Sequence, residues 1–398
     1  MMKTDKRTLP NGWRWAKLED LGSFDSGGTP SKNEKHYWGG DIPFVTGADI
    51  TDLYITAQHA RAFLTDAGLT SGKTAICKPG TILFVTRTRV GRVGIAADVM
   101  GASQDLSPYA CGPEIVPEFA CRYLQSVSDY LISGARGSTI QGLTREFVHK
   151  LEIPVPPLDE QRRIAAILSE QLAIVERARV AAKAQLEAAE ALPAAYLRAV
   201  FNDSQQWPMK RLGDLLQLRK EVIHPYDKPS GPAMFVGLEH IESGTGIRIG
   251  SEPVEMSNLA GRKPRFYKGD IVYGYLRPYL NKVWIAEFDG LCSVDQYVYS
   301  VDASQADTAY VAWFMRSPSY LKRAPIDTTP GQLPRIRLEE VAAVEIDLPS
   351  LAEQQSIVCD LDSRLASARQ AYEALRSQLD AIEKMPAALL RQAFNGEL

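Results

Sequence analysis

The chain has 398 residues, which is more than one hydrophobic core usually holds and predicts two or more domains. Its composition is that of an ordinary globular protein, with 45% hydrophobic residues, 23% charged residues and a formal net charge of -3. No apolar run approaches the roughly 20 residues of a membrane-spanning helix, and the first residues lack the apolar stretch of a signal peptide. The five cysteines form no C-x-x-C motif, which favours reduced thiols and a cytoplasmic protein.

Residues 13–157 predict a mixed, strand-rich module, because short β-branched and aromatic runs alternate with Gly, Pro and Asp breaks. Residues 81–85 form one such run, and residues 117–132 predict a short helix. Basic residues gather between positions 61 and 94, where Asp66 is the single acid: Arg61, Lys73, Lys78, Arg87, Arg89 and Arg92.

Residues 158–201 predict one long helix. Apolar residues from Ile164 to Ala189 recur at spacings of three, four or seven, which places them on one face. Pro154, Pro156 and Pro157 precede the helix, where proline is tolerated, whereas Pro193 should kink or restart it.

Residues 207–350 predict a second mixed module, with strand-like runs at 271–275, 283–285 and 297–301 and a helix at 309–321. Here too basic residues gather, between positions 261 and 284 and against Asp270 alone: Arg262, Lys263, Arg265, Lys268, Arg277 and Lys282. Tyr273, Tyr275 and Tyr279 interleave with this second cluster.

The chain ends in a second long helical pattern that repeats the first. Residues 158–202 and 351–395 align without a gap, so that Glu160-Gln161 matches Glu353-Gln354 and Pro193 matches Pro386. Before its proline each helix runs about 35 residues, or roughly 50 Å, and a helix of that length needs a partner to cover its apolar face. The sequence therefore predicts an α+β fold: two mixed α/β modules separated by two long helices that form an antiparallel coiled coil with a pseudo-twofold internal repeat.

Catalytic motifs do not appear in the sequence. Gly72-Lys73-Thr74 lacks the first glycine of a phosphate-binding loop, and there is no H-E-x-x-H, no G-x-S-x-G and no glycine-rich dinucleotide fingerprint. The matched basic clusters favour contacts with DNA phosphates and guanine edges, although a basic cluster is also typical of a solvated face. The apolar helix stripes predict core, with outer positions left to dock helices of a partner protein.

Several of these segments resemble one known family. Pro157-Leu158-Asp159-Glu160-Gln161 and Ser350-Leu351-Ala352-Glu353-Gln354 each precede a long helix, and the pieces Gly137–Leu143, Gly269–Tyr273 and Leu276–Lys282 also match. Together they resemble the specificity subunits of type I restriction-modification systems. The chain departs from the pattern at Ser350, where the family often has proline, and at Pro79-Gly80-Thr81 in place of Lys-Gly-Asp.

The resemblance implies four parts: target-recognition domains at 1–157 and 203–350, and spacer helices at 158–202 and 351–398. Each target-recognition domain would read one half of a bipartite site in double-stranded DNA. The helices would fix the unread spacer and dock two methyltransferase subunits, to which restriction-translocase subunits are added. The chain would be non-catalytic and bind no cofactor, because S-adenosylmethionine, Mg and ATP belong to those partner subunits.

Two sets of residues follow as candidates. The DNA-binding set is Lys73, Arg87, Arg89, Arg92, Ser138, Thr139, Gln141, Arg262, Lys263, Arg265, Tyr275, Arg277, Tyr279 and Lys282. The partner-binding set is Glu160, Gln161, Leu197, Phe201, Glu353, Gln354, Leu390 and Phe394. Two alternatives stay open: a specificity subunit of a related fused restriction-methylation enzyme, and a coiled-coil scaffold that does not read DNA.

Overall fold

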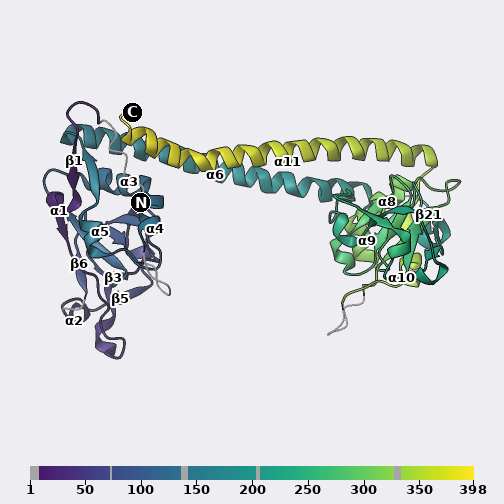
Figure 1. The fold of residues 1–398 in the computed structure, drawn as a ribbon, viewed down its shortest axis with the longest axis horizontal. Coiled ribbons are helices and arrows are strands. Elements are labelled where there is room, and N and C mark those ends of the chain that lie inside the picture. The colour runs from purple at the N-terminus through teal and green to yellow at the C-terminus, as the bar shows by residue number, and fades with distance from the viewer. Residues whose placement is uncertain (1–8, 72–73, 136–141, 203–206, 327–332) are drawn as a thin grey trace. The chain divides into compact units, whose positions relative to one another are not determined.

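A computed structural model describes residues 9–71, 74–135, 142–202, 207–326 and 333–398 (Figure 1). The chain divides into two compact units. Unit 1 comprises residues 1–182 and 378–398, and unit 2 comprises residues 183–377. The two long helices, α6 (Leu158–Val200) and α11 (Leu351–Phe394), each contribute one part to unit 1 and the other part to unit 2.

Unit 1 holds two sheets and a strand pair. The sheets have the strand orders β2-β10-β7-β8-β4 and β5-β3-β9-β6, and β1 pairs with β11. The elements before α6 are β1 (Arg14–Lys17), α1 (Leu18–Leu21), β2 (Gly22–Phe24), η1 (Lys35–Tyr37), β3 (Trp38–Val45), β4 (Tyr54–Ile55), η2 (Ala57–His59), β5 (Ala62–Leu64), α2 (Asp66–Leu69), β6 (Ala75–Cys77), β7 (Ile82–Val85), β8 (Val93–Ala96), β9 (Met100–Ala102), β10 (Leu106–Cys111), α3 (Pro117–Ser126), α4 (Ser128–Gly134), α5 (Arg145–His149) and β11 (Glu152–Val155).

Unit 2 repeats this plan. Its sheets have the orders β13-β21-β18-β19 and β14-β17-β20-β15-β16, and β12 pairs with β22. The elements between α6 and α11 are β12 (Met209–Arg211), α7 (Leu212–Leu215), β13 (Leu216–Leu218), β14 (Val222–Ile223), η3 (Pro225–Asp227), β15 (Pro232–Val236), η4 (Leu238–His240), β16 (Glu252–Glu255), η5 (Met256–Asn258), β17 (Lys263–Phe266), β18 (Ile271–Gly274), η6 (Pro278–Leu280), β19 (Val283–Ile285), β20 (Gly290–Cys292), β21 (Gln296–Val301), α8 (Thr308–Arg316), α9 (Pro318–Arg323), α10 (Leu338–Ala343) and β22 (Glu345–Asp347).

The central strand of each unit is buried on both faces. In β7, Ile82 and Phe84 point into a core shared with α3, whereas Leu83 points to a second core between the sheets. In β18, Ile271 and Val272 divide between two cores in the same way. Because side chains alternate along a strand, a strand between two cores reads as a continuous apolar run, as the sequence shows.

The predicted short helices exist but are each split in two. The expected helix at 117–132 is α3 followed by α4, and the expected helix at 309–321 is α8 followed by α9. In unit 2 the break falls at Ser317, an extended residue whose hydroxyl caps the new helix that begins with Pro318. Proline lacks the backbone N–H that would continue α8, so the break follows from the sequence.

The long helices α6 and α11 pack together in antiparallel fashion, as the sequence predicts. In unit 1, Val175 from the first half of α6 packs with Ile382 near the end of α11. In unit 2 the pairing is reversed, since Leu197 near the end of α6 shares a core with Leu361 near the start of α11. Pro193 and Pro386 lie inside uninterrupted helices, so neither proline restarts its helix.

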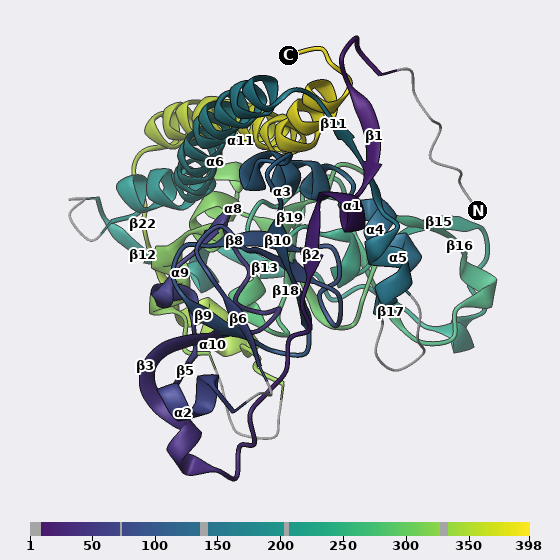
Figure 2. The ribbon, with the colours of Figure 1, turned by 90° about the vertical axis from the view of Figure 1, so that its left-hand side faces the viewer.

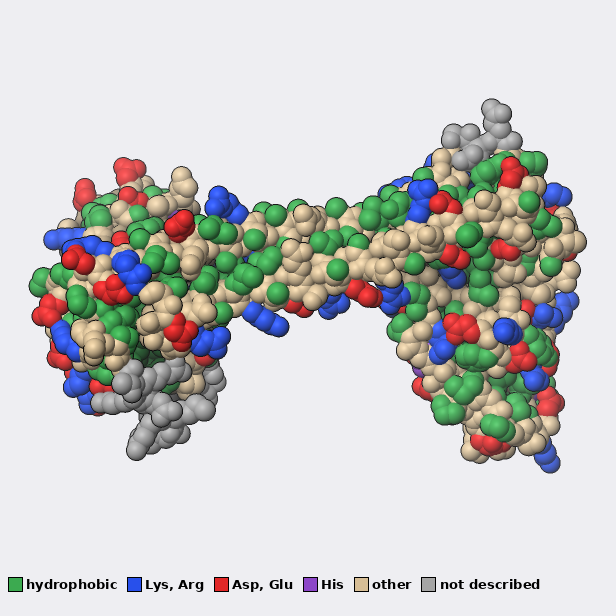
Figure 3. Space-filling model, turned by 90° about the horizontal axis from the view of Figure 1, so that it is seen from above, with side chains coloured by type: hydrophobic (Ala, Val, Ile, Leu, Met, Phe, Trp, Pro, Cys, Tyr) green, Lys and Arg blue, Asp and Glu red, His purple; other side chains and the backbone are tan. Residues whose placement is uncertain are grey.

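The outward placement expected for four apolar residues is wrong. Leu197 and Phe201 are buried beneath α8 of unit 2, where Phe201 contacts Tyr310 and Phe314. Leu390 and Phe394 lie in the core of unit 1, and Figure 2 shows the end of α11 beside α3. These side chains close each unit's own core, because the helix ends they belong to cover α3 and α8. The exposed apolar residues on the long helices are others, including Ile174, Val180 and Met385. Figure 3 shows hydrophobic side chains at the surface of the long helices.

None of the helices in the described part of the chain is long and apolar enough to cross a membrane.

Candidate nucleic-acid interface

The loop between β7 and β8 of unit 1 presents exposed guanidinium groups. Arg87 and Arg89 flank Thr88, which adopts the left-handed backbone conformation with φ of 63°. Both arginine side chains are exposed, and neither forms an ion pair within the described residues. Two other segments of the same chain hold the loop in place. Thr86 donates its N–H to the Asp105 carbonyl at 2.9 Å, and Arg87 forms a β-bridge with Gly142.

Unit 2 builds the same loop between β18 and β19. Tyr275 donates its N–H to the Asp295 carbonyl at 3.1 Å, and Leu276 forms a β-bridge with Arg335. The next residue, Arg277, has a left-handed φ of 49°, like Thr88 in unit 1, and its N–H donates to the Pro334 carbonyl at 2.6 Å. The two loops therefore share their backbone bonds, their bridges and their strained position.

A left-handed non-glycine residue costs of the order of 1–3 kcal/mol and persists only where the surrounding structure fixes it. In unit 2 the fixing bonds are dense. The Asn281 side chain donates to the Arg316 carbonyl at 2.6 Å, and the Asn281 carbonyl accepts the Gly244 N–H at 3.1 Å. The Lys282 ammonium donates to the Leu238 carbonyl at 2.6 Å. The loop is thus pre-organised, while Tyr279 at its tip keeps 54% of its surface exposed.

A stacked tyrosine pair and two arginines extend this surface in unit 2. Tyr275 stacks on Tyr297 with ring centroids 4.5 Å apart. Burial raises the pKa of Tyr275, as does Asp295 beside it, whereas the positive charges of Arg335 and Arg262 act in the opposite direction. Both arginines are exposed and form no ion pair within the described residues. Aromatic faces flanked by guanidinium groups suit contacts with bases and phosphates.

Three of the cationic residues predicted to bind DNA make contacts within unit 2 instead. Lys263 lies 4.6 Å from the Phe235 ring centroid, Arg265 pairs with Glu221 at 3.2 Å, and Lys282 is bound to a carbonyl as described above. In unit 1, Arg92 contacts the Ile50 carbonyl at 3.5 Å. These contacts leave the four cations less available for DNA binding than Arg87, Arg89 and Arg277 are. The predicted residues Lys73, Ser138, Thr139 and Gln141 lie outside the described residues.

Arg335 is a candidate that the sequence reasoning missed. It occupies in unit 2 the position of Gly142 in unit 1, and both residues bridge to the strand-end residue of their loop. The alignment offset of the long helices, carried back into the modules, pairs these two positions. A basic residue there was therefore detectable, but it lies outside the basic cluster at 261–284.

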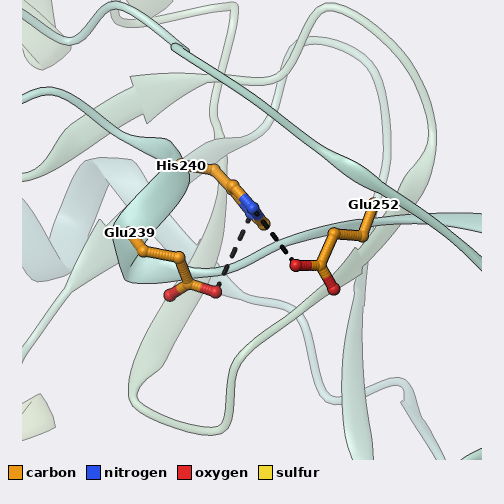
Figure 4. A group of neighbouring side chains, drawn as sticks. All are labelled: Glu239, His240 and Glu252. Atoms are coloured by element: carbon orange, nitrogen blue, oxygen red, sulfur yellow. Dashed lines mark ion pairs between the residues drawn. The ribbon is translucent and has the colours of Figure 1, made fainter.

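One group of side chains has the composition of a metal site (Figure 4). Glu239, His240 and Glu252 bring ligand atoms within 4.8 Å of one another, and His240 Nε2 lies 3.6 Å from Glu252 Oε1. His240 Nδ1, however, accepts the Gly237 N–H at 3.0 Å. In unit 1 the Asp49 carboxylate accepts the equivalent Thr46 N–H at 2.8 Å. A turn-capping role therefore accounts for His240.

Comparisons with known proteins place this fold. A family model described as the type I restriction modification DNA specificity domain matches residues 10–188. The MjaIX type I restriction enzyme specificity subunit of Methanocaldococcus jannaschii is 24% identical, covering 100% of this chain and 96% of the relative. The EcoDI specificity subunit of Escherichia coli is also 24% identical, covering 98% of this chain and 89% of the relative.

The chain is thus similar to type I restriction enzyme specificity subunits over nearly its whole length.

Two solved structures share the fold of this chain. A chain from a study of complex assembly and conformational transition of the type I R-M system superposes with a TM-score of 0.74, at 19% identity and with coverage of 98% and 100% of the two chains. The HsdS subunit of Thermoanaerobacter tengcongensis has a TM-score of 0.65, at 18% identity, with 99% of each chain covered.

The glutamine of each duplicated Glu-Gln pair connects its module to the long helix. The Gln161 side chain accepts the Val116 N–H at 2.8 Å and donates to the Glu114 and Pro156 carbonyls, both at 2.9 Å. Gln354 accepts the Asp307 N–H at 2.8 Å and donates to the carbonyls of Gln305 and Pro349. Both side chains are fully buried, so the expectation that they contact a partner protein is wrong.

The neighbouring glutamates and Ser350 have local roles. Glu160 pairs with Arg163, whose guanidinium also donates to the Leu398 carbonyl. Glu353 accepts both the N–H and the hydroxyl of Ser350, which completes a capping box at the start of α11. Ser350, the departure from the family pattern, thus supplies a helix cap that a proline lacks.

Proposed function

We propose that this chain is the DNA-reading subunit of a type I restriction-modification complex. Each module reads one half of a bipartite site in double-stranded DNA, and the long helices set the spacing between the halves. The chain carries no reaction itself, so methylation and cleavage, with S-adenosylmethionine, Mg and ATP, take place on two methyltransferase subunits and on restriction-translocase subunits.

The matched loops after β7 and β18 carry this proposal. They have one backbone design, fixed by the same bonds, and different side chains at their tips. Arg87 and Arg89 stand at the tip in unit 1, whereas Arg277 and Tyr279 stand there in unit 2. Two modules that recognise different half-sites require this combination of one loop backbone and two different sets of side chains. Exposed arginines offer the paired donors that recognise guanine in the major groove.

The proposed docking surface for the methyltransferase subunits is the exposed side of the long helices. Ile174 and Val180 are 49% and 57% exposed on α6, and Met385 is 45% exposed on α11. Two helices alone leave such side chains in water, and helices of a partner would cover them. This surface replaces Leu197, Phe201, Leu390 and Phe394, which are used inside the chain.

A methylation map tests the proposal. The chain is co-expressed with the methyltransferase subunit encoded beside it, in a host that lacks DNA methylation. The positions of N6-methyladenine are then located by sequencing. The expected result is a motif of two short halves around a gap of fixed length. A well-folded complex that methylates no DNA would instead favour a scaffold without DNA readout.

The loop arginines are tested by substitution in the same complex. Arg87→Ala and Arg277→Ala should each weaken cognate binding by about 1–3 kcal/mol if the side chain contacts a base. If it contacts a phosphate, the slope of log affinity against log salt should fall by about 1. Arg265→Ala is the matched control, because that arginine pairs with Glu221. Unchanged affinity and unchanged slope for both loop variants would remove these residues from the interface.

A further inference from the structure

A buried arginine, Arg316, lies against the loop between β18 and β19 of unit 2. It is the last residue of α8, and only 7% of its surface is exposed. Its Nε donates to the Val283 carbonyl at 2.9 Å, and its own backbone carbonyl accepts the Asn281 side-chain amide at 2.6 Å. One residue thus holds the chain at two positions, where the loop ends and β19 begins.

Two further groups keep the Arg316 guanidinium in place. Its Cζ lies 4.4 Å from the Trp313 ring centroid, and the Trp313 indole N–H donates to the Asp362 carboxylate of α11 at 2.9 Å. Gly246, in the turn that a β-bridge closes between Ile241 and Arg248, also lies against the guanidinium. A Cβ atom on Gly246 would overlap the guanidinium, so only glycine leaves it room.

The charge of Arg316 has no ion-pair partner within the described residues. Burial lowers the pKa of Arg316 to about 10, and the negative charge of Asp362 acts in the opposite direction. The guanidinium therefore stays charged near neutral pH. A buried charge without an ion-pair partner is unfavourable for stability, and the Trp313 ring offsets only part of that cost. Stability alone does not explain an arginine here, whereas its contacts with the loop do.

Unit 1 has no such arginine. Gln161 and Gln354 accept the N–H groups of Val116 and Asp307, which aligns α3 with α8 and places Gln125 at the position of Arg316. The Gln125 side chain accepts a hydrogen bond from Arg122 at 3.0 Å. Within the described residues it makes no hydrogen bond to the loop of its own unit. The hold of an arginine on the loop is thus a feature of unit 2.

We propose that Arg316 is a positioning residue for the DNA-reading loop of unit 2. By holding Asn281 and Val283, it fixes the direction in which Arg277 and Tyr279 meet a half-site, without touching DNA itself. The reading of DNA rests on the proposed function, whereas the hold on the loop rests on the contacts of Arg316 within unit 2.

The hold on the loop is tested first, by amide hydrogen exchange of the full chain without partners. Arg316→Gln introduces the residue of unit 1, which is shorter and uncharged. Peptides that cover residues 276–283 should exchange at least tenfold faster in this variant, because the loop opens more often. Peptides from the rest of unit 2 should exchange within twofold of the wild type. Unchanged exchange in the loop, or an equal rise throughout unit 2, would overturn the proposal.

A matched pair of glycine variants tests the same contact while Arg316 is kept. Gly246 and Gly269 both have a left-handed backbone, with φ of 72° and 88°, so alanine brings a similar strain to each. The new methyl group would overlap the guanidinium at Gly246, whereas at Gly269 it would meet no atom within 4 Å. Gly246→Ala should speed exchange of the loop as Arg316→Gln does, and Gly269→Ala should leave it within twofold. Equal effects of the two alanines would overturn the proposal.

The effect on DNA reading is tested second, in the complex with the methyltransferase subunit. A library of sites with single-base changes in each half gives the ratio of methylation rates between cognate and altered sites. Replacement of residues 203–350 identifies the half that unit 2 reads. For that half, Arg316→Gln and Gly246→Ala should lower the ratio at least fivefold. For the other half the ratio should stay within twofold, because the contacts of Arg316 lie in unit 2.

The outcomes separate this proposal from the proposed function. Wild-type ratios in both variants, or equal losses in both halves, would overturn the positioning role and leave the proposed function intact. A wild-type complex that methylates no DNA would overturn the proposed function and with it the role of Arg316 in DNA reading. The exchange measurement would still decide whether Arg316 holds the loop.

Discussion

At the scale of single residues, the buried glutamines Gln161 and Gln354 show how one side chain joins a module to a helix. Each amide uses its oxygen and its nitrogen on three backbone groups of two segments. A buried N–H left without an acceptor costs about 1–3 kcal/mol. Glutamine alone among the common side chains offers an acceptor and two donors at this reach, so the recurrence of Glu-Gln has a physical reason.

Gln161→Ala should therefore lower the free energy of unfolding of unit 1 by about 2–3 kcal/mol, because it leaves the Val116 N–H buried without a partner. Urea unfolding followed by circular dichroism measures the loss. Glu160→Ala serves as the control, since its pair with Arg163 is partly solvent-exposed and contributes only a few tenths of a kcal/mol. Equal losses in the two variants would contradict the assigned role of Gln161.

Three of the cysteines are buried, Cys111 is half-buried and Cys359 is exposed. Burial raises the pKa of the thiols of Cys77, Cys111, Cys121 and Cys292 to about 12, because it disfavours the charged thiolate. Cys359 lies exposed on α11. Only the thiolate reacts with alkylating agents, so the exposed residue should react alone.

Iodoacetamide at pH 8 should accordingly add one label to the folded chain, at Cys359. At that pH about one in ten thousand thiols with a pKa near 12 is ionised. Intact-mass spectrometry counts the labels and peptide mapping locates them. Raising the pH toward 12 should increase labelling of the other four, as should unfolding in urea. Two or more labels on the folded chain at pH 8 would contradict this burial pattern.

At the scale of elements, the ends of the long helices are parts of the module cores. Phe394 of α11 packs against Phe119 and Tyr123 of α3, at ring distances of 5.3 and 5.2 Å. Phe201 of α6 packs on α8 in the same manner. Each module thus depends on helix residues that lie far away in the sequence, and the apolar stripe alone did not reveal which residues those are.

Phe394→Ala should destabilise unit 1 by about 3 kcal/mol, the lower end of the range for removing an aromatic side chain from a core, because Phe394 is only partly buried. Thermal unfolding followed by calorimetry measures the change. Ile174→Ala is the comparison: this residue is 49% exposed on α6, and its loss should cost well under 1 kcal/mol. If the Phe394 variant were as stable as the wild type, Phe394 of α11 would not contribute to the core of unit 1.

At the scale of the whole molecule, the duplication gives each unit a complete set of structural parts. Each unit has its own loop, its own cores and its own buried glutamine, so the two loops proposed to read DNA are each supported by their own unit. The unlike tips of the loops predict unlike half-sites. Exchange of one module should then leave the other module's reading unchanged.

Replacing residues 1–157 with the equivalent segment of another specificity subunit should change one half of the methylated motif and preserve the other half and the gap. The methylation map described above reads all three features at once. As a control, replacing residues 203–350 should change the opposite half. A change in both halves from either exchange would mean that the modules do not read DNA independently.

Much of this fold was predictable from the sequence, because a repeat and a helical period are local patterns. The gapless match of residues 158–202 with 351–395 predicts two like helices, and short β-branched and aromatic runs such as 271–275 predict the central strands. The break between α8 and α9 was also readable, since Pro318 cannot continue a helix. The basic clusters predicted Arg87 and Arg277 as DNA-binding residues, and both side chains are exposed.

Only the tertiary structure decided which side chains remain free. In the folded chain Lys263, Arg265 and Lys282 make contacts within unit 2, and Arg335 lies beside the loop. The two glutamines and Phe201 are buried. The physical reason is that the availability of a charge or an apolar face depends on neighbours brought together by packing. Those neighbours are distant in sequence, so composition and spacing do not specify them.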